Sequence, residues 1–102
     1  IDLNQAYPLG LTINELISNS LKYAFPDERE GEICVSIKKL DTELELTVMD
    51  NGVGIPKDLD WKNSKSLGLK LVRILVENQL DGSVEMENTN GTKFTIKFNI
   101  ET

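Results

Sequence analysis

The sequence predicts a two-layer α/β sandwich, and two observations support this. The first is the order of patterns along the chain: helical apolar spacing precedes a pair of alternating segments, and the same order then repeats. The second is size, because 102 residues with 39% hydrophobic content suit one compact domain that hides roughly 60–68% of its unfolded surface. Helices and strand pairs in this order bury their apolar faces by packing as two layers. We therefore expect a single domain over residues 1–102.

The first helix is predicted over residues 9–24. Pro8 suits a first helical turn, where its missing N–H needs no partner, and Pro26 ends the helix. One helical face collects the apolar residues Leu9, Ile13, Leu16, Ile17 and Ala24.

Two antiparallel hairpins are predicted from alternating apolar and polar residues. The first joins strands at 32–39 and 43–50, and the second joins strands at 83–87 and 92–100. The turn of the second hairpin contains Asn90-Gly91, a strong turn signal.

The second helix is predicted to begin with Ser66 as its N-cap and to end at Asp81-Gly82. Its apolar residues are Leu67, Leu71, Ile74, Leu75 and Leu80. Residues 56–65 show no clear periodicity, which favours a loop.

Composition limits the classes of partner. Seventeen acidic against eleven basic residues give a net charge of -6, which argues against binding to nucleic acid or anionic membranes.

Cys34 lies alone in an apolar run, so we expect a buried thiol, no internal disulfide and a reducing cytoplasmic setting. No apolar run approaches the roughly 20 residues of a membrane span, so the domain itself is expected to be soluble. Because the chain begins at Ile1, we expect a piece of a longer protein whose membrane attachment stays open.

A candidate base pocket follows the strand at 43–50. Asp50 ends this strand, and Gly52 and Gly54 allow a sharp bend and close approach of a flat ligand. A carboxylate here accepts hydrogen bonds from an exocyclic amine. The alternative is an ordinary β-turn, since Asn and Gly are common turn residues.

A polar stripe on the first helix contains Glu15, Asn19 and Lys22, which lie within roughly 60° of one another around the axis. An amide oxygen suits Mg²⁺ when phosphates complete the octahedron, and a lysine neutralises phosphate. Tyr23 offers a flat surface for a base. The chain lacks histidine, so Glu15 is the candidate for proton abstraction. The alternative is a solvated helix face.

The start of the second helix, at Ser66, Leu67, Gly68 and Leu69, offers unpaired backbone N–H groups to an anion. Gly68 would let a phosphate come close. Alone this signal is weak, because most helices begin without binding a ligand.

Four segments in order resemble the N box and glycine boxes of the GHKL ATPase superfamily: NELISNSLKYAF (14–25), DNGVGIP (50–56), SLGLKLV (66–72) and NGTKF (90–94). Within it the chain looks most like the ATP-binding catalytic domain of sensor histidine kinases, in the subfamily with Asn-Glu in the N box and a short lid. This resemblance implies the Bergerat fold, a mixed, mostly antiparallel sheet with helices on one face.

The resemblance also implies ATP and Mg²⁺ as ligands and assigns roles to residues. Asn19 would ligate Mg²⁺, Asp50 would receive the adenine amine, and Glu15 would be the candidate catalytic base. Residues 56–65 would form the lid, with Lys57, Lys62 and Lys65 near phosphate. The expected nucleotide-binding residues are Asn19, Lys22, Tyr23, Asp50, Gly52, Gly54, Ile55, Ser66, Leu67, Gly68, Leu69 and Thr92.

Two departures from the family pattern stand out. Most histidine kinases carry Asn at the position of Glu15, whereas ATPase and serine-kinase branches use a Glu there as general base. Ser66 replaces the first glycine of the lid box, and the Phe-containing box is missing, so a long lid is not expected.

The function expected from the resemblance is phosphoryl transfer from MgATP to a histidine on a separate dimerisation domain of the parent protein, with a response regulator downstream. The alternatives are a serine kinase that inhibits a sigma factor and a non-catalytic nucleotide-binding module.

Overall fold

The computed structural model describes residues 3–21, 31–52, 67–88 and 91–100. Two helical segments and four strands follow one another along these ranges. Their bounds are α1 Leu3–Asn19, β1 Ile33–Leu40, β2 Glu43–Asp50, α2 Leu67–Ile74, its π-helical continuation η4 Leu75–Gln79, β3 Ser83–Glu87 and β4 Lys93–Asn99. The predicted order of helix, two strands, helix, two strands is therefore confirmed.

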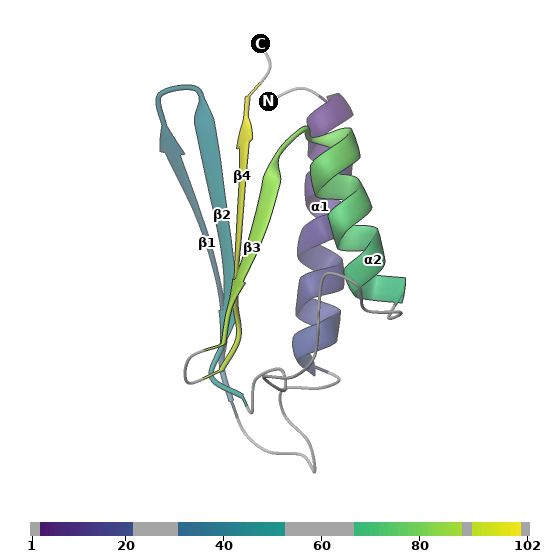
Figure 1. The fold of residues 1–102 in the computed structure, drawn as a ribbon. Coiled ribbons are helices and arrows are strands. Elements are labelled where there is room, and N and C mark those ends of the chain that lie inside the picture. The colour runs from purple at the N-terminus through teal and green to yellow at the C-terminus, as the bar shows by residue number, and fades with distance from the viewer. Residues whose placement is uncertain (1–2, 22–30, 53–66, 89–90, 101–102) are drawn as a thin grey trace.

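The four strands form one sheet in the order β1-β2-β4-β3. All three pairings are antiparallel, and both predicted hairpins are present. The helices α1 and α2 lie side by side on one face of this sheet (Figure 1). The predicted two-layer α/β class is confirmed, with an antiparallel sheet in the part of the chain that the structure describes.

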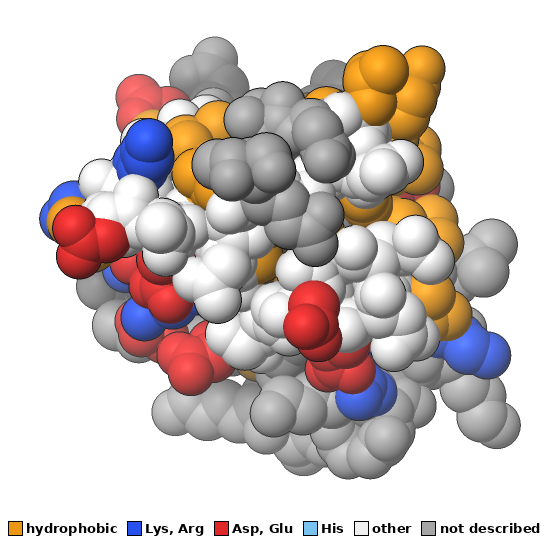
Figure 2. Space-filling model, turned by 90° about the horizontal axis from the view of Figure 1, so that it is seen from above, with side chains coloured by type: hydrophobic (Ala, Val, Ile, Leu, Met, Phe, Trp, Pro, Cys, Tyr) orange, Lys and Arg blue, Asp and Glu red, His pale blue; other side chains and the backbone are white. Residues whose placement is uncertain are grey.

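Strand alternation divides the sheet into an apolar and a polar face. On β2 the helix-facing residues Leu44, Leu46 and Val48 are buried, and on β4 Phe94, Ile96 and Phe98 lie opposite them in register. The other face carries Glu45 opposite Lys97. Seen from above, most of the coloured charged side chains lie on the sheet side and most of the hydrophobic ones on the helix side, where a few charged side chains also lie (Figure 2). The period of two residues thus directs one face to the helices and one to solvent.

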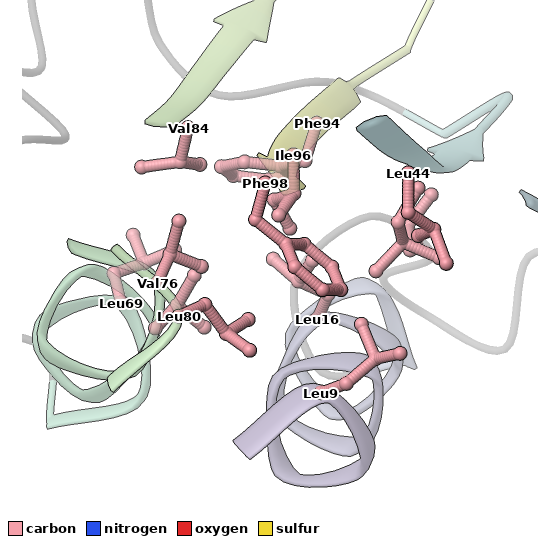
Figure 3. Packing of buried hydrophobic residues seen from close by; sticks show 13 residues of the cluster. Leu9, Leu16, Leu44, Leu69, Val76, Leu80, Val84, Phe94, Ile96 and Phe98 are labelled. Carbon is pink, nitrogen blue, oxygen red and sulfur yellow. The ribbon is translucent and has the colours of Figure 1, made fainter. Parts of the chain in front are cut away.

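The core lies between the two layers (Figure 3). Leu16 of α1 and Val76 of η4 meet the sheet residues Leu46 and Ile96, and all four side chains are almost fully buried. Burying such a side chain contributes about 1.5–3 kcal/mol each. This contact fixes how α1 is rotated against the sheet.

The first helix begins earlier than predicted. It already includes Leu3, so Pro8 lies inside α1 rather than in its first turn. Gln5 is buried and its Nε2 donates to the backbone carbonyl of Asn99 at 2.8 Å, which ties the early turns to the end of β4. This long-range contact stabilises turns that lie before the proline. The predicted end at residue 24 lies outside the described residues.

The second helix buries a different stripe from the one predicted. The core residues are Leu69, Val72, Leu75, Val76 and Leu80. Leu75 and Leu80 were predicted correctly, but Ile74 is 41% exposed and Leu71 only half-buried. Apolar residues spread over more than half of the helix circumference, leaving one arc to Arg73, Glu77 and Lys70, so more than one apolar stripe fits helical spacing and packing on the sheet selects between them.

The end of this helical segment is tight. The N–H of Gly82 donates to the carbonyl of Val76 at 2.9 Å, while Asp81 takes a φ of 54°. A Cβ on Gly82 would overlap the carbonyl oxygen of Lys97. The predicted stop at Asp81-Gly82 is confirmed, and the glycine is required by the neighbouring strand.

The prediction of a buried thiol is wrong, because Cys34 is exposed. The cysteine lies on β1, an edge strand, opposite Met49 on the face that the helices do not cover. Val35 and Ile37, on the opposite face of β1, are also exposed. An apolar run predicts burial only where a second layer covers the strand, and the described helices do not cover β1.

Candidate functional site

Asp50 is the centre of the site, at the end of β2. The residue is only 8% exposed, and its carboxylate accepts two backbone hydrogen bonds at Oδ1, from the N–H of Gly52 at 3.0 Å and that of Thr92 at 3.3 Å. A buried carboxylate requires such donors, because an unsatisfied buried charge is strongly unfavourable. The β2 end and the start of β4 therefore fix one oxygen of the predicted base-reading residue.

The other carboxylate oxygen meets the first helix. The Ser20 hydroxyl donates to Asp50 Oδ2 at 2.8 Å, and both residues are buried. Ser20 comes one turn after the core residue Leu16, so the same helix face that packs on the sheet brings the hydroxyl to Asp50. This bond connects the two layers at the site.

The backbone near Thr92 closes one side of the site. The N–H of Asp50 donates to the Thr92 carbonyl at 2.9 Å, and Thr92 is itself buried. Gly91 has a φ of 121°, a conformation that other residues rarely adopt, and a Cβ there would overlap the carbonyl oxygen of Asp50. The predicted turn glycine thus also allows β4 to start beside Asp50.

Asn51 joins the site to the sheet edge. Its Oδ1 accepts from the N–H of Glu32 at 2.8 Å, and its own N–H donates to the Glu32 carbonyl at 3.3 Å. The pairing of β1 with β2 is therefore extended one residue beyond Asp50. In this arrangement Asn51 stabilises the sheet edge through its bonds to the backbone of Glu32.

Glu15 and Asn19 lie one turn apart on α1, as the stripe predicts. Both are half-buried rather than fully solvated. The Nδ2 atom of Asn19 is buried and has no hydrogen-bond partner among the described residues. Native side chains rarely leave such an atom unpaired unless a ligand or water completes the site. This orphaned amide fits a ligand-binding role better than a solvated helix face.

The start of α2 lies at the same end of the molecule as the end of α1 and the end of β2 (Figure 1). Leu67, Gly68 and Leu69 form its first turn, so their backbone N–H groups belong to a helix N-terminus. The Leu69 side chain is buried in the core, so its contribution to a ligand would come from its backbone. The order of the elements thus brings the described candidate nucleotide-binding residues to one end of the molecule.

Several predicted site residues lie outside the described residues: Lys22, Tyr23, Gly54, Ile55, Ser66 and the lid at 56–65 with Lys57, Lys62 and Lys65. Their roles stay predictions. Where the structure is described, no helix has the length and apolar character to cross a membrane. Nor do three His, Cys, Asp or Glu side chains gather there as a metal-binding group.

The sequence motifs did not assign a role to Ser20 or Gly91. The signal for Ser20 was a small polar residue that continues the apolar stripe one turn beyond Leu16. Gly91 was recognised as a turn residue, but its contact with Asp50 depends on the pairing of β2 with β4.

Comparison with known proteins agrees with this geometry. Residues 4–102 match the family described as histidine kinase-, DNA gyrase B-, and HSP90-like ATPase. The chain belongs to this ATPase family. As members bind ATP, the buried carboxylate and the orphaned amide lie in an ATP-binding fold.

Sensor histidine kinases are among the relatives. The chain is 36% identical to sensor histidine kinase PdtaS of Mycobacterium tuberculosis (strain CDC 1551 / Oshkosh) over 89 residues, or 86% of this chain and 18% of that protein. The histidine kinase domain of the Erythrobacter litoralis EL346 blue-light activated kinase superposes with a TM-score of 0.88 and 32% identity, covering 97% of this chain and 46% of that one. Serine-protein kinase RsbW of Listeria innocua is 30% identical over 84 residues, 69% of this chain and 54% of that protein. The chain thus spans about a fifth of the PdtaS protein.

Proposed function

We propose that this chain is the catalytic, ATP-binding domain of a two-component sensor histidine kinase. In this proposal it binds MgATP and positions the γ-phosphoryl group for transfer to a histidine on a dimerisation domain of the parent protein, with a response regulator downstream. The observation that carries it is the buried Asp50 carboxylate, held by three donors at the end of the sheet where α1 and α2 also meet.

Adenine recognition is assigned to Asp50. A carboxylate has about four acceptor sites, and the three observed donors leave room for one more. An exocyclic amine supplies such a donor. A buried acceptor discriminates strongly in favour of a base that carries the amine, because a base without it leaves the acceptor unpaired.

Phosphate and metal binding are assigned to α1 and to the start of α2. Phosphate-bound Mg²⁺ takes few ligands from a protein, and the Asn19 amide oxygen is of the right kind. The buried Asn19 Nδ2 has no partner among the described residues, and as an N–H donor it suits a phosphate oxygen. MgATP supplies the phosphoryl group and the divalent charge. The chain orients these groups, and positioning with charge neutralisation carries most of the catalysis in phosphoryl transfer.

The phosphoryl acceptor must come from another domain, since the chain contains no histidine. Three large apolar side chains on α1 are spaced by four residues and exposed: Leu3, Tyr7 and Leu11. Exposed apolar residues on one helix stripe are typical of an interaction surface. We assign this stripe to contact with the histidine-containing domain.

The deciding experiment is transfer of labelled phosphate from MgATP to the separately prepared histidine domain of the parent protein. We expect label on the histidine with the unchanged chain, and at least about tenfold less with Asn19→Ala, because one metal ligand is lost. Asn4→Ala is the matched control, since Asn4 is exposed on the same helix. Equal labelling by both variants would remove Asn19 from the metal site.

A serine kinase is the second candidate, supported by the similarity to RsbW and by Glu15, one turn before Asn19. Acid treatment separates the two, because phosphoserine survives mild acid and phosphohistidine does not. Acid-stable label on a partner protein, lost with Glu15→Gln, would replace the histidine kinase proposal.

A non-catalytic module is the third possibility. MgATP at 100 times its Kd raises the free energy of unfolding by about 2.7 kcal/mol. We therefore expect a clear rise in melting temperature with MgATP, whereas no shift at millimolar nucleotide would favour a module without nucleotide binding.

A further inference from the structure

We propose that Ser20 is a positioning residue for base recognition. Its hydroxyl group holds the Asp50 carboxylate so that Oδ2 presents one acceptor site to the 6-amino group of a purine nucleotide. This inference rests on the proposed function, because it assigns specificity at the same nucleotide site.

The geometry divides the work between the two oxygens of Asp50. Oδ1 accepts from the N–H groups of Gly52 and Thr92, which uses both of its lone pairs. Oδ2 accepts from Ser20, which uses one lone pair and leaves one. Recognition of an amine therefore takes place at the oxygen that Ser20 orients.

Ser20 is the donor to Oδ2 within the described ranges. It is 9% exposed and Asp50 is 8% exposed, so water competes little for this bond. Hydrogen bonds to an ionised acceptor are roughly twice as strong as neutral ones. Without the hydroxyl group, the carboxylate would keep its two backbone donors but could rotate about the axis through Oδ1.

Packing alone does not explain a serine here. Position 20 follows the core residue Leu16 by one turn, and a buried hydroxyl group is unfavourable unless it is hydrogen-bonded. The bond to Asp50 satisfies this hydroxyl group, and it reaches from the helix layer to the sheet layer. The serine thus couples the position of α1 to the oxygen that reads the base.

The test compares two nucleotides by titration calorimetry: MgATP, and the magnesium complex of purine riboside triphosphate, which lacks the 6-amino group. The unchanged chain should bind MgATP about tenfold or more tightly than the analogue. Ser20→Ala should weaken MgATP binding about five- to tenfold and leave analogue binding within about twofold. The ratio of the two dissociation constants is the readout, because a general loss of structure would weaken both nucleotides alike.

Ser18→Ala is the matched control, with the same substitution two residues earlier on α1, and should leave both affinities unchanged. Equal loss of both nucleotides in Ser20→Ala, or no loss of either, overturns the proposal. If Ser20→Ala fails to fold, Ser20→Cys replaces the hydroxyl group by a poor donor of similar size and is judged by the same ratio. Failure of the unchanged chain to bind either nucleotide would instead overturn the proposed function.

Discussion

At the scale of the residue, the two oxygens of Asp50 perform different tasks. Oδ1 holds the backbone of Gly52 and Thr92 in place, so it belongs to the fold as much as to the site. Oδ2 accepts from Ser20 within the described ranges, and one of its acceptor sites is left for a ligand there. Substitutions that keep one oxygen and change the other therefore separate stability from recognition.

Asp50→Asn makes this separation. The amide oxygen can keep both backbone bonds, while the amide nitrogen turns a donor toward the adenine amine, where an acceptor is needed. We expect MgATP affinity to fall about a hundredfold. The melting temperature should change by less than about 5 °C.

Titration calorimetry measures the MgATP affinity of Asp50→Asn, and thermal unfolding of the same sample measures its melting temperature. Asp50→Ala is the informative comparison, because it leaves the N–H groups of Gly52 and Thr92 without their acceptor and should be clearly less stable than Asp50→Asn. Unchanged ATP affinity in Asp50→Asn would exclude Asp50 as the adenine acceptor.

At the scale of the element, glycines have opposite roles in a helix and at a strand start. Gly10 lies inside α1 on an exposed face, and a Cβ there meets no atom within 4 Å. Gly91 precedes β4, has a positive φ and lies against the carbonyl group of Asp50. The same substitution therefore has opposite expected effects at these two positions.

Gly10→Ala should raise the free energy of unfolding by about 0.5–1 kcal/mol, because alanine loses less backbone entropy in a helix. Gly91→Ala should lower it by about 2–3 kcal/mol, through backbone strain and the overlap with Asp50. Urea unfolding at one temperature measures both. Equal effects of the two substitutions would contradict the conformation of Gly91.

At the scale of the whole molecule, two layers leave one sheet face open. The helices cover the face of β2, β4 and β3 that carries the core (Figure 1), while the opposite face is mostly polar and is half-buried to exposed. The edge strand β1 is exposed on both faces along most of its length. Accessibility along β1 is therefore set by architecture and not by hydropathy.

The thiol of Cys34 tests this arrangement. We expect a thiol reagent to modify one cysteine per chain in the native state, at a rate within about tenfold of that in urea, since exposure controls access. Mass spectrometry locates the modification. Cys34→Ser is the blank for the assay. A native thiol that reacts only after unfolding would show that β1 is covered.

Much of the fold could be predicted from local patterns. The strands at β2 and β3 were predicted at their observed bounds because alternation is strict there and turns flank them. The start of α1 could not be predicted, since Gln5 bonds to Asn99, 94 residues away. The motif order proposed Asp50 and Asn19 as site residues, which stays a prediction, whereas the bond of Asp50 to Ser20 across the layers is a tertiary contact that the motifs do not show.

The sequence by itself determined the order of elements, the two hairpins and the residue types available for an ATP site, because these follow from periodicity, turn residues and motif spacing over short range. Tertiary structure alone decided which stripe of the second helix faces the sheet, whether Cys34 is covered, and which donors hold Asp50. The reason is physical: an apolar arc wider than one stripe can face the sheet in more than one rotation, and a buried carboxylate takes its donors from the groups that the packed layers bring within reach.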